Sequence, residues 1–285
     1  MSRERLDVRK TYKLLINGAF PRSESGRSYE VLSHDGEFWA NVVQGSRKDA
    51  RDAVRAARTA QATWWGATAY NRGQVLYRWA EMAEARHGEL CEHVAHSEGL
   101  VLSEARASVD RSIDRIVWYA GWTDKLAQVL GGSNPVAGPY FNFSLPVPCG
   151  VVAVLAPQGS SLEGFVEAVL APLAAGNSVV AVASQQRPTP AVLLGEMSAT
   201  ADFPPGVLNV LTGVTRELGE TVASHADVDG LDLAGAGEIA SDWAVLAAES
   251  IKRVLMPLEN PRASTSLRGL RAFVETTTVW HTIGQ

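Results

Sequence analysis

Residues 150–184 read GVVAVLAPQGSSLEGFVEAVLAPLAAGNSVVAVAS, an apolar strand, a helix and a second apolar strand. Both strands are unbroken apolar runs, which is typical of strands buried on both faces of a parallel sheet. Further strands follow at VLNVLTG and VDGLDLAG, and helices are predicted over 190–201, 215–223 and 240–252. This alternation predicts an α/β fold with a Rossmann-type, doubly wound parallel sheet over residues 149–258.

Three helices are predicted upstream of the sheet. The first begins at Ser46, which opens a sequence close to a capping box. The second covers about 70–98, and the third runs from near Ser103 to Gly131-Gly132, because glycine commonly ends a helix. With short β-prone runs before them, these helices make up the segment 1–137, which we expect to pack on the Rossmann-like body.

Two segments that are far apart in the sequence are predicted to form strands outside the body. Residues 138–148, GPYFNFSLPVP, alternate polar and apolar side chains, and their prolines confine them to an edge or a projecting arm. Residues 268–285 are dense in β-branched side chains and have no neighbouring strand in sequence to pair with. A short connector, 259–267, joins this last segment to the body.

Composition excludes several classes of protein. Apolar residues make up 46% of the chain and charged residues 20%, as in an ordinary globular protein. The net charge of -5 argues against nucleic acid as a partner, because phosphate binding needs a basic surface. No apolar run approaches the roughly 20 residues of a membrane span. Two cysteines and a charged opening segment predict a reducing, cytoplasmic location.

One short motif is compatible with nucleotide binding. In LAGAGEIA, residues 233–240, Gly235, Gly237 and Ala240 fit the pattern G-x-G-x-x-A between a strand and a helix. Such a turn lets the backbone approach a pyrophosphate at a helix N-terminus. The motif follows the fourth strand rather than the first, however, and no acidic residue is suitably placed after it. A tight strand-to-helix turn is therefore the favoured interpretation.

Metal and nucleophile chemistry lack a convincing arrangement. One helix carries four side chains of metal-binding type, but they do not share one face, so no metal site is expected. These side chains are His87, Cys91, His93 and His96. Cys149 lies where a strand begins, and neither cysteine has a nearby base or helix N-terminus, so neither is predicted to be a nucleophile.

The order of these segments, from Leu14 to about Leu258, resembles the aldehyde dehydrogenase superfamily. The stretch YKLLINGAF is similar to the family's opening, and NPVAGPYFNFSLPVPCGVVAVLAP is similar to its oligomerisation arm followed by the first Rossmann strand. Three further stretches, LAAGNSVVAV, FPPGVLNVLTG and HADVDGLDLAG, resemble the family's successive strand signatures. The final LRAFVETTTVWHTIG resembles the family's last strand, which joins the arm. This order implies N-terminal helices, a Rossmann-type body and a projecting β arm.

The resemblance also implies two sets of functional residues. The arm would contact a partner subunit through Phe141, Phe143, Leu145, Val274, Thr278 and Trp280. A weak, vestigial cofactor site would include Pro157, Gly213, Gly235 and Gly237. No cofactor is expected, and NAD(P) would bind only if this vestigial site still functions.

Departures from the family pattern argue against catalysis. Between Pro261 and Leu267 there is no room for the family's catalytic domain, which carries the cysteine nucleophile. At the family's Pro-Trp-Asn motif this chain has Pro157-Gln158-Gly159, which removes the amide that would stabilise an oxyanion. The remaining substitutions fall at the two ribose-binding positions, the strand-to-helix serine and the general base. They are, in that order, Val182, Gln185, Ala236 and Pro257.

Three hypotheses follow for the function. The chain is similar to the non-catalytic second module of two-module aldehyde dehydrogenases, so it is expected to be a pseudoenzyme subunit. Because it keeps the arm and lacks the sheet that receives another copy's arm, a full-length aldehyde dehydrogenase is the expected partner, with a homo-oligomer as the alternative. The second hypothesis is a nucleotide-binding module. The third is a residual NAD(P)-dependent aldehyde oxidoreductase in which Glu259 or Cys149 has taken over a role.

Overall fold

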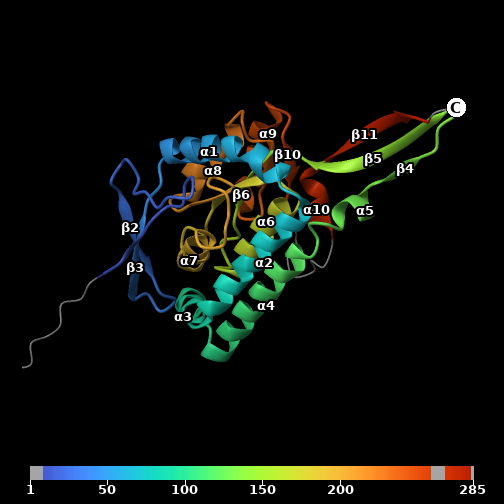
Figure 1. The fold of residues 1–285 in the computed structure, drawn as a ribbon. Coiled ribbons are helices and arrows are strands. Elements are labelled where there is room, and N and C mark those ends of the chain that lie inside the picture. Colours follow the sequence, from blue (N-terminus) through green and yellow to red (C-terminus); the bar gives the residue numbers. More distant parts are fainter. Residues whose placement is uncertain (1–8, 258–266, 284–285) are drawn as a thin grey trace, which may run out of the picture.

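The computed structural model describes residues 9–257 and 267–283 (Figure 1). Its body is built on a five-stranded parallel sheet with the strand order β10-β9-β6-β7-β8. The strands are β6 (Val151–Leu155), β7 (Ser178–Val182), β8 (Leu208–Leu211), β9 (Gly230–Asp232) and β10 (Arg253–Leu255). The chain moves outward from β6 to β8 and then returns to β9 on the other side of β6. This reversal confirms the predicted doubly wound sheet.

The sheet is buried on both faces because its residues point alternately into two apolar cores. Val152 and Val154 of β6 belong to the larger core, whereas Val151, Ala153 and Leu155 belong to the smaller one. The larger core includes α6 (Glu163–Ala174) and α7 (Thr189–Ser198). The smaller core is covered by α1 (Arg47–Gly66), α8 (Thr215–Ser224) and α9 (Ala240–Ala248). The unbroken apolar runs thus reflect burial on both sides.

The segment before the sheet packs against this body. It contains a small sheet of β1 (Thr11–Tyr12), β3 (Phe38–Val43) and β2 (Ser28–Leu32), in that order. Besides α1, it contains four further helices, α2 (Ala69–Ala85), α3 (His87–Glu98), α4 (Leu102–Ala120) and α5 (Leu126–Leu130). At the start of α1, Ser46 and Asp49 form a complete capping box, which confirms the predicted helix start.

The helix predicted over 70–98 is wrong in one respect, because two helices occupy this range. The chain leaves helical geometry at Arg86, whose ψ angle is 24°. The Arg86 guanidinium donates to both carboxylate oxygens of Glu89, at 2.7 and 2.9 Å, and lies 3.5 Å from Glu196 on α7. Arg86 is thus fixed at the break by ion pairs with Glu89 on α3 and with Glu196 on α7. The break contains no proline that could have indicated it in the sequence.

The third predicted helix also ends earlier than expected. The helix α4 stops at Ala120, a turn follows, and the short α5 then reaches Gly131. Thr123 stabilises the turn by donating its hydroxyl to the carbonyl of Ala120 at 3.0 Å. A local side-chain bond to the backbone therefore competes with continued helix.

The predicted arm is a three-stranded antiparallel sheet that projects from the body (Figure 1). Its central strand β5 (Tyr140–Pro148) pairs over nine residues with β11 (Val274–Thr282) on one side. On the other side it pairs with the three-residue strand β4 (Gly132–Asn134). The last strand of the chain therefore finds its partner in residues more than a hundred positions earlier.

The structure draws the limits of the arm differently from the predicted 138–148 and 268–285. The strand β4 joins the arm although it falls within the predicted N-terminal segment. The helix α10 (Arg268–Ala272) packs on α6 and β10 of the body instead. The connector 259–267 lies outside the described residues apart from Leu267, and so does Glu259.

Candidate functional site

The carboxyl edge of the parallel sheet is where α/β proteins bind ligands. Here it is formed by the loops that follow β6, β7, β8 and β9. These loops contain every residue predicted for a vestigial cofactor site, and the structure shows what each one contacts.

Three of the four predicted cofactor residues lie in contact with the protein itself. A methyl group on Gly235 would collide with the carbonyl oxygen of Ala156, and the Gly235 amide donates to the carbonyl of Leu155 at 2.8 Å. Gly213 faces the backbone of Gly45. The ring of Pro157 packs against Gly164. Only Gly237, with a φ angle of 58°, has open space where a side chain would stand.

Gly235 is therefore expected to matter for stability without any nucleotide present. The substitution Gly235→Ala should lower the free energy of unfolding by about 1–3 kcal/mol, because it forces two backbone segments apart. Denaturant unfolding of the nucleotide-free chain measures this. Gly159→Ala is the matched control, since a methyl group at Gly159 meets nothing within 4 Å. An unchanged stability of Gly235→Ala would show that this glycine is not needed for packing.

Two glutamines connect the loops of the carboxyl edge. Gln158 Oε1, in the loop after β6, accepts from the backbone amide of Gln185 at 2.9 Å, in the loop after β7. Gln185 Oε1 in turn accepts from the backbone amide of Thr215 at 3.0 Å, the first residue of α8. The loops after three neighbouring strands are thus joined by side chains of the protein.

The other substituted positions at this edge complete the comparison with the family pattern. Val182 ends β7 and is fully buried, and Ala236 is nearly buried in the smaller core. The carbonyl of Gly159 accepts from the guanidinium of Arg187 at 2.7 Å. Among the described residues, and apart from Gly237, the positions that would hold a dinucleotide thus offer alkyl groups, or polar groups already bonded within the chain. They do not fit NAD(P).

Of the two free cysteines, Cys91 is buried and Cys149 is half-buried. Burial raises the pKa of Cys149 to about 12, and its Sγ donates to Asn177 Oδ1 at 3.3 Å. It precedes β6 and therefore lies at the amino end of the sheet, away from the carboxyl edge. Burial also raises the pKa of Cys91. Neither environment favours the thiolate that a nucleophile requires.

The side chains of metal-binding type on α3 are directed to different partners. His87 Nε2 lies 2.8 Å from Asp110 Oδ1, and His93 Nε2 lies 3.2 Å from Tyr12 Oη. The ring of His96 stacks on that of Trp39. Within the ranges that the structure covers, no group of three or more histidine, cysteine or acidic residues could hold a metal ion.

One titratable residue was not among the predicted sites. Asp232, the last residue of β9, is buried, and burial raises its pKa to about 7. Its Oδ1 accepts from the Ala234 amide at 2.9 Å. The charged groups that act on it are Arg268, which lowers its pKa, and Glu167, which raises it. The sequence did contain a signal for it, because Asp232 is an acidic residue at the end of a strand whose other residues are apolar or glycine.

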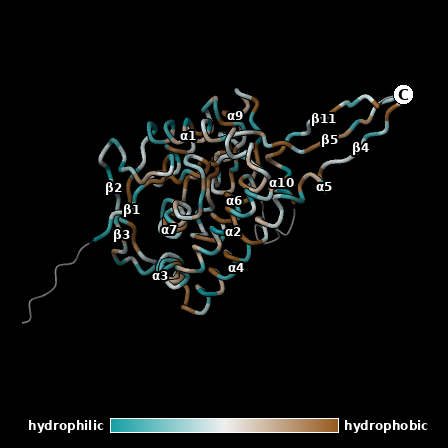
Figure 2. Tube along the Cα trace, in the orientation of Figure 1, coloured by the Kyte–Doolittle hydropathy of each residue, from teal (hydrophilic) through white to brown (hydrophobic). Residues whose placement is uncertain are grey.

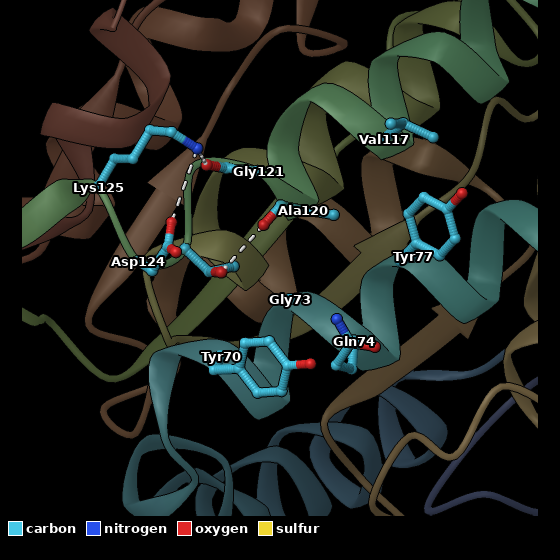
Figure 3. A pocket seen from close by; sticks show the side chains of 10 residues that line it. Tyr70, Gly73, Gln74, Tyr77, Val117, Ala120, Gly121, Asp124 and Lys125 are labelled. Atoms are coloured by element: carbon cyan, nitrogen blue, oxygen red, sulfur yellow. Dashed lines mark hydrogen bonds and ion pairs between the residues drawn. The ribbon is translucent and has the colours of Figure 1, made fainter.

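A cavity of about 280 Å³ lies on the helical side of the body, between α2 and the end of α4 (Figure 3). Tyr70, Tyr77 and Val117 form its apolar wall. The Lys125 ammonium at its rim is engaged by the Gly121 carbonyl and by Asp124. This hollow lacks a base paired with a nucleophile, so it carries no catalytic arrangement.

The arm presents its predicted partner-binding residues on two opposite faces. Because facing residues of paired strands share a face, the register places Phe141, Phe143 and Leu145 on one side. Val274, Thr278 and Trp280 lie on the other. Apolar and polar residues are accordingly mixed along both long strands (Figure 2). The ring of Trp280 is well exposed and meets Tyr140 edge to face. The predicted partner-binding residues therefore do not form a single face of the arm.

No helix in the described part of the chain is long and apolar enough to cross a bilayer.

Comparison with known proteins identifies a family. A model of the aldehyde dehydrogenase family matches residues 20–261. The chain is 35% identical over 251 residues to aldehyde dehydrogenase family 2 member B4, mitochondrial, of Arabidopsis thaliana, which covers 86% of this chain and 46% of that protein. It is 32% identical over 259 residues to retinal dehydrogenase 2 of Gallus gallus, which covers 89% of this chain and 49% of that protein.

Solved structures agree with the sequence matches. An aldehyde dehydrogenase from Brucella melitensis biovar abortus 2308 matches with a TM-score of 0.82 at 25% identity, over 86% of this chain and 50% of that one. An NAD+ complex of the aldehyde dehydrogenase from Bacillus cereus matches with a TM-score of 0.81 at 27% identity, over 87% and 50%. The chain thus spans about half the length of the relatives it matches. Because it shares their fold and aligns with them over most of its own length, this chain belongs to the aldehyde dehydrogenase family.

Proposed function

We propose that this chain is a non-catalytic subunit that assembles, through its arm, with a full-length aldehyde dehydrogenase in a structural or regulatory role. The observation that carries the proposal is the long free edge of β11, which pairs on one side only within the described residues. Free strand edges recruit other strands, and proteins that keep a long one use it or cover it.

The hydrogen-bond pattern of the arm defines which groups this edge offers. The Ile283 amide donates to the Pro139 carbonyl, and the Phe273 carbonyl accepts from the Cys149 amide, so both residues face β5. Because bonding alternates along an antiparallel strand, the even-numbered residues between them direct their backbone groups away from β5. Thr276, Thr278 and Trp280 therefore present amides and carbonyls to an incoming strand.

The non-catalytic part of the proposal is supported by the chemistry of the sheet edge. The thiol of Cys149 is half-buried, has a raised pKa and lies at the amino end of the sheet, and the residues at the carboxyl edge do not fit NAD(P). A hydride transfer would need a cofactor site and a reactive thiol together. Residual aldehyde oxidation is the less favoured function for this reason.

The partner is inferred from what the arm would need. In the family the arm adds its strands to the catalytic-domain sheet of a neighbouring subunit, and the sequence has no room for that domain between Pro261 and Leu267. A full-length member can supply the receiving sheet. A second copy of this chain would have to pair edge to edge instead.

Co-expression with a full-length aldehyde dehydrogenase from the same cell tests the proposal, with native mass as the measurement. We expect a mixed oligomer for the unmodified chain and for Thr278→Val. We expect association to weaken by about tenfold or more for Thr278→Pro, which removes one outward amide at the free edge. Both variants lose the contact of the Thr278 hydroxyl with Ser144, so they differ only in the backbone. A native mass that shows no mixed oligomer for the unmodified chain would contradict the proposal.

A further inference from the structure

We propose that the side chains of Gln158 and Gln185 are a built-in substitute for a nucleotide, holding the carboxyl edge of the sheet in one conformation without a ligand. The inference concerns the isolated chain and is independent of the assembly proposed above. It rests on a set of hydrogen bonds that span the loops after β6, β7 and β8.

The first connection joins the loops after β6 and β7. Gln158 Nε2 donates to the carbonyl of Ala156 at 3.0 Å, which fixes the side chain against its own loop. Its Oε1 then accepts from the Gln185 amide at 2.9 Å. A second donor from the loop after β7, the Ser184 hydroxyl, donates to the Gln158 carbonyl at 3.2 Å. Both the backbone and the side chain of Gln158 are therefore bonded to the neighbouring loop.

The second connection joins the loop after β7 to the start of α8. The first amides of a helix have no partner within it, and they are the groups that bind phosphates. The residue before α8, Val214, offers no side-chain cap. Gln185 Oε1 takes this place by accepting from the Thr215 amide at 3.0 Å. A glutamine from another loop thus occupies the donor that an anion would use.

Two further groups hold this arrangement from outside. The hydroxyl of Tyr29, on β2, donates to the Gln185 carbonyl at 3.1 Å. Arg187 donates from Nη1 to the Gly159 carbonyl at 2.7 Å, and its backbone amide donates to the Ser184 hydroxyl. Arg187 thus ties the loop after β7 to the loop after β6 through both its side chain and its backbone.

These hydrogen bonds would oppose nucleotide binding, because a bound nucleotide would break some of them. A phosphate that took the Thr215 amide would leave Gln185 Oε1 without its donor, and a ribose between the loops would separate Gln158 from Gln185. Gln158 and Gln185 are half-buried, and a polar group shielded from water is destabilised when it loses its partner, so the ligand would have to offset such losses. The chain therefore keeps an ordered sheet edge and excludes the dinucleotide by the same bonds.

Hydrogen exchange of the full-length chain, measured residue by residue, tests the inference. We expect Gln185→Ala to speed exchange of the Thr215 amide by about tenfold or more, and Gln158→Ala to do the same for the Gln185 amide. Gln185→Glu should keep the Thr215 amide protected, because a carboxylate also accepts at a helix N-terminus. Gln74→Ala, at an exposed glutamine of α2, is the control and should change neither amide.

Two results would overturn the inference. The first is unchanged exchange at Thr215 and at Gln185 in the alanine variants, which would show that the glutamines do not hold the loops. The second is slower exchange across residues 156–160 and 183–187 of the unmodified chain when millimolar NAD+ is added. Since no partner enzyme is present, neither result depends on whether the chain joins an oligomer.

Discussion

Replacing Phe273 by alanine is expected to lower the free energy of unfolding by about 3–5 kcal/mol, the usual loss for a fully buried phenylalanine. Its ring is completely buried and contacts the sheet where Gly230 has no side chain. Its carbonyl accepts from the Cys149 amide at 3.1 Å and from Asn177 Nδ2 at 3.0 Å. This single residue, the link between α10 and β11, therefore anchors both elements to the body.

Phe273→Leu is the matched control, since it keeps most of the apolar volume and should cost less than half as much. Denaturant unfolding gives both free energies. Hydrogen exchange adds a second measurement, because loss of the anchor should speed exchange along β11 more than along β7. Equal stability of Phe273→Ala and the unmodified chain would show that the last segment is held by the arm pairing alone.

Replacing Asp232 by asparagine is expected to stabilise the protein in a strongly pH-dependent way. Burial raises the pKa of this carboxyl from 3.8 to about 7. Between these values the folded chain holds the proton and the unfolded chain releases it, so the unmodified protein loses stability as the pH rises from about 4 to about 7. Asparagine keeps an acceptor for the Ala234 amide and cannot ionise. At about pH 8 the gain is of the order of 4 kcal/mol, whereas at about pH 5 it is much smaller.

Unfolding free energies at several pH values measure this difference. Asp242→Asn, at an exposed position of α9, is the control for removing one negative charge from the surface. A gain from Asp232→Asn that is constant from about pH 5 to about pH 8 would contradict the raised pKa. The same comparison would show whether this residue limits the stability of the chain near neutral pH.

The sheet and the arm could be predicted from sequence because their signals are local and strong. The runs around Val152 and Val180 are apolar at every position, which only burial on both faces explains. The capping-box pattern that begins at Ser46 correctly predicted the start of α1. The last strand was recognisable from its β-branched residues, and the resemblance supplied its partner in β5.

Other features were out of reach because they depend on contacts between distant residues. The break at Arg86 depends on Glu196, more than a hundred residues later. The strand β10 has only three residues and becomes a strand by pairing with β9. The bond between Gln185 and Thr215 spans 30 positions. In the sequence these glutamines are visible only as substitutions, and their positive role emerges from the geometry.

The two edges of the arm are unequal, and this limits how assemblies can grow. Pro146 and Pro148 lie beyond the end of the short β4, and the alternation of bonds along β5 directs their positions toward that side. Since proline has no amide hydrogen, this side cannot be extended along its length by another strand. An arm with one open edge and one blocked edge can add to the edge of another sheet, but no further strand can then pair along its blocked side. If the arm adds to a partner strand as proposed, the chain would end that row of strands, and complexes formed through the arm would stay finite in size.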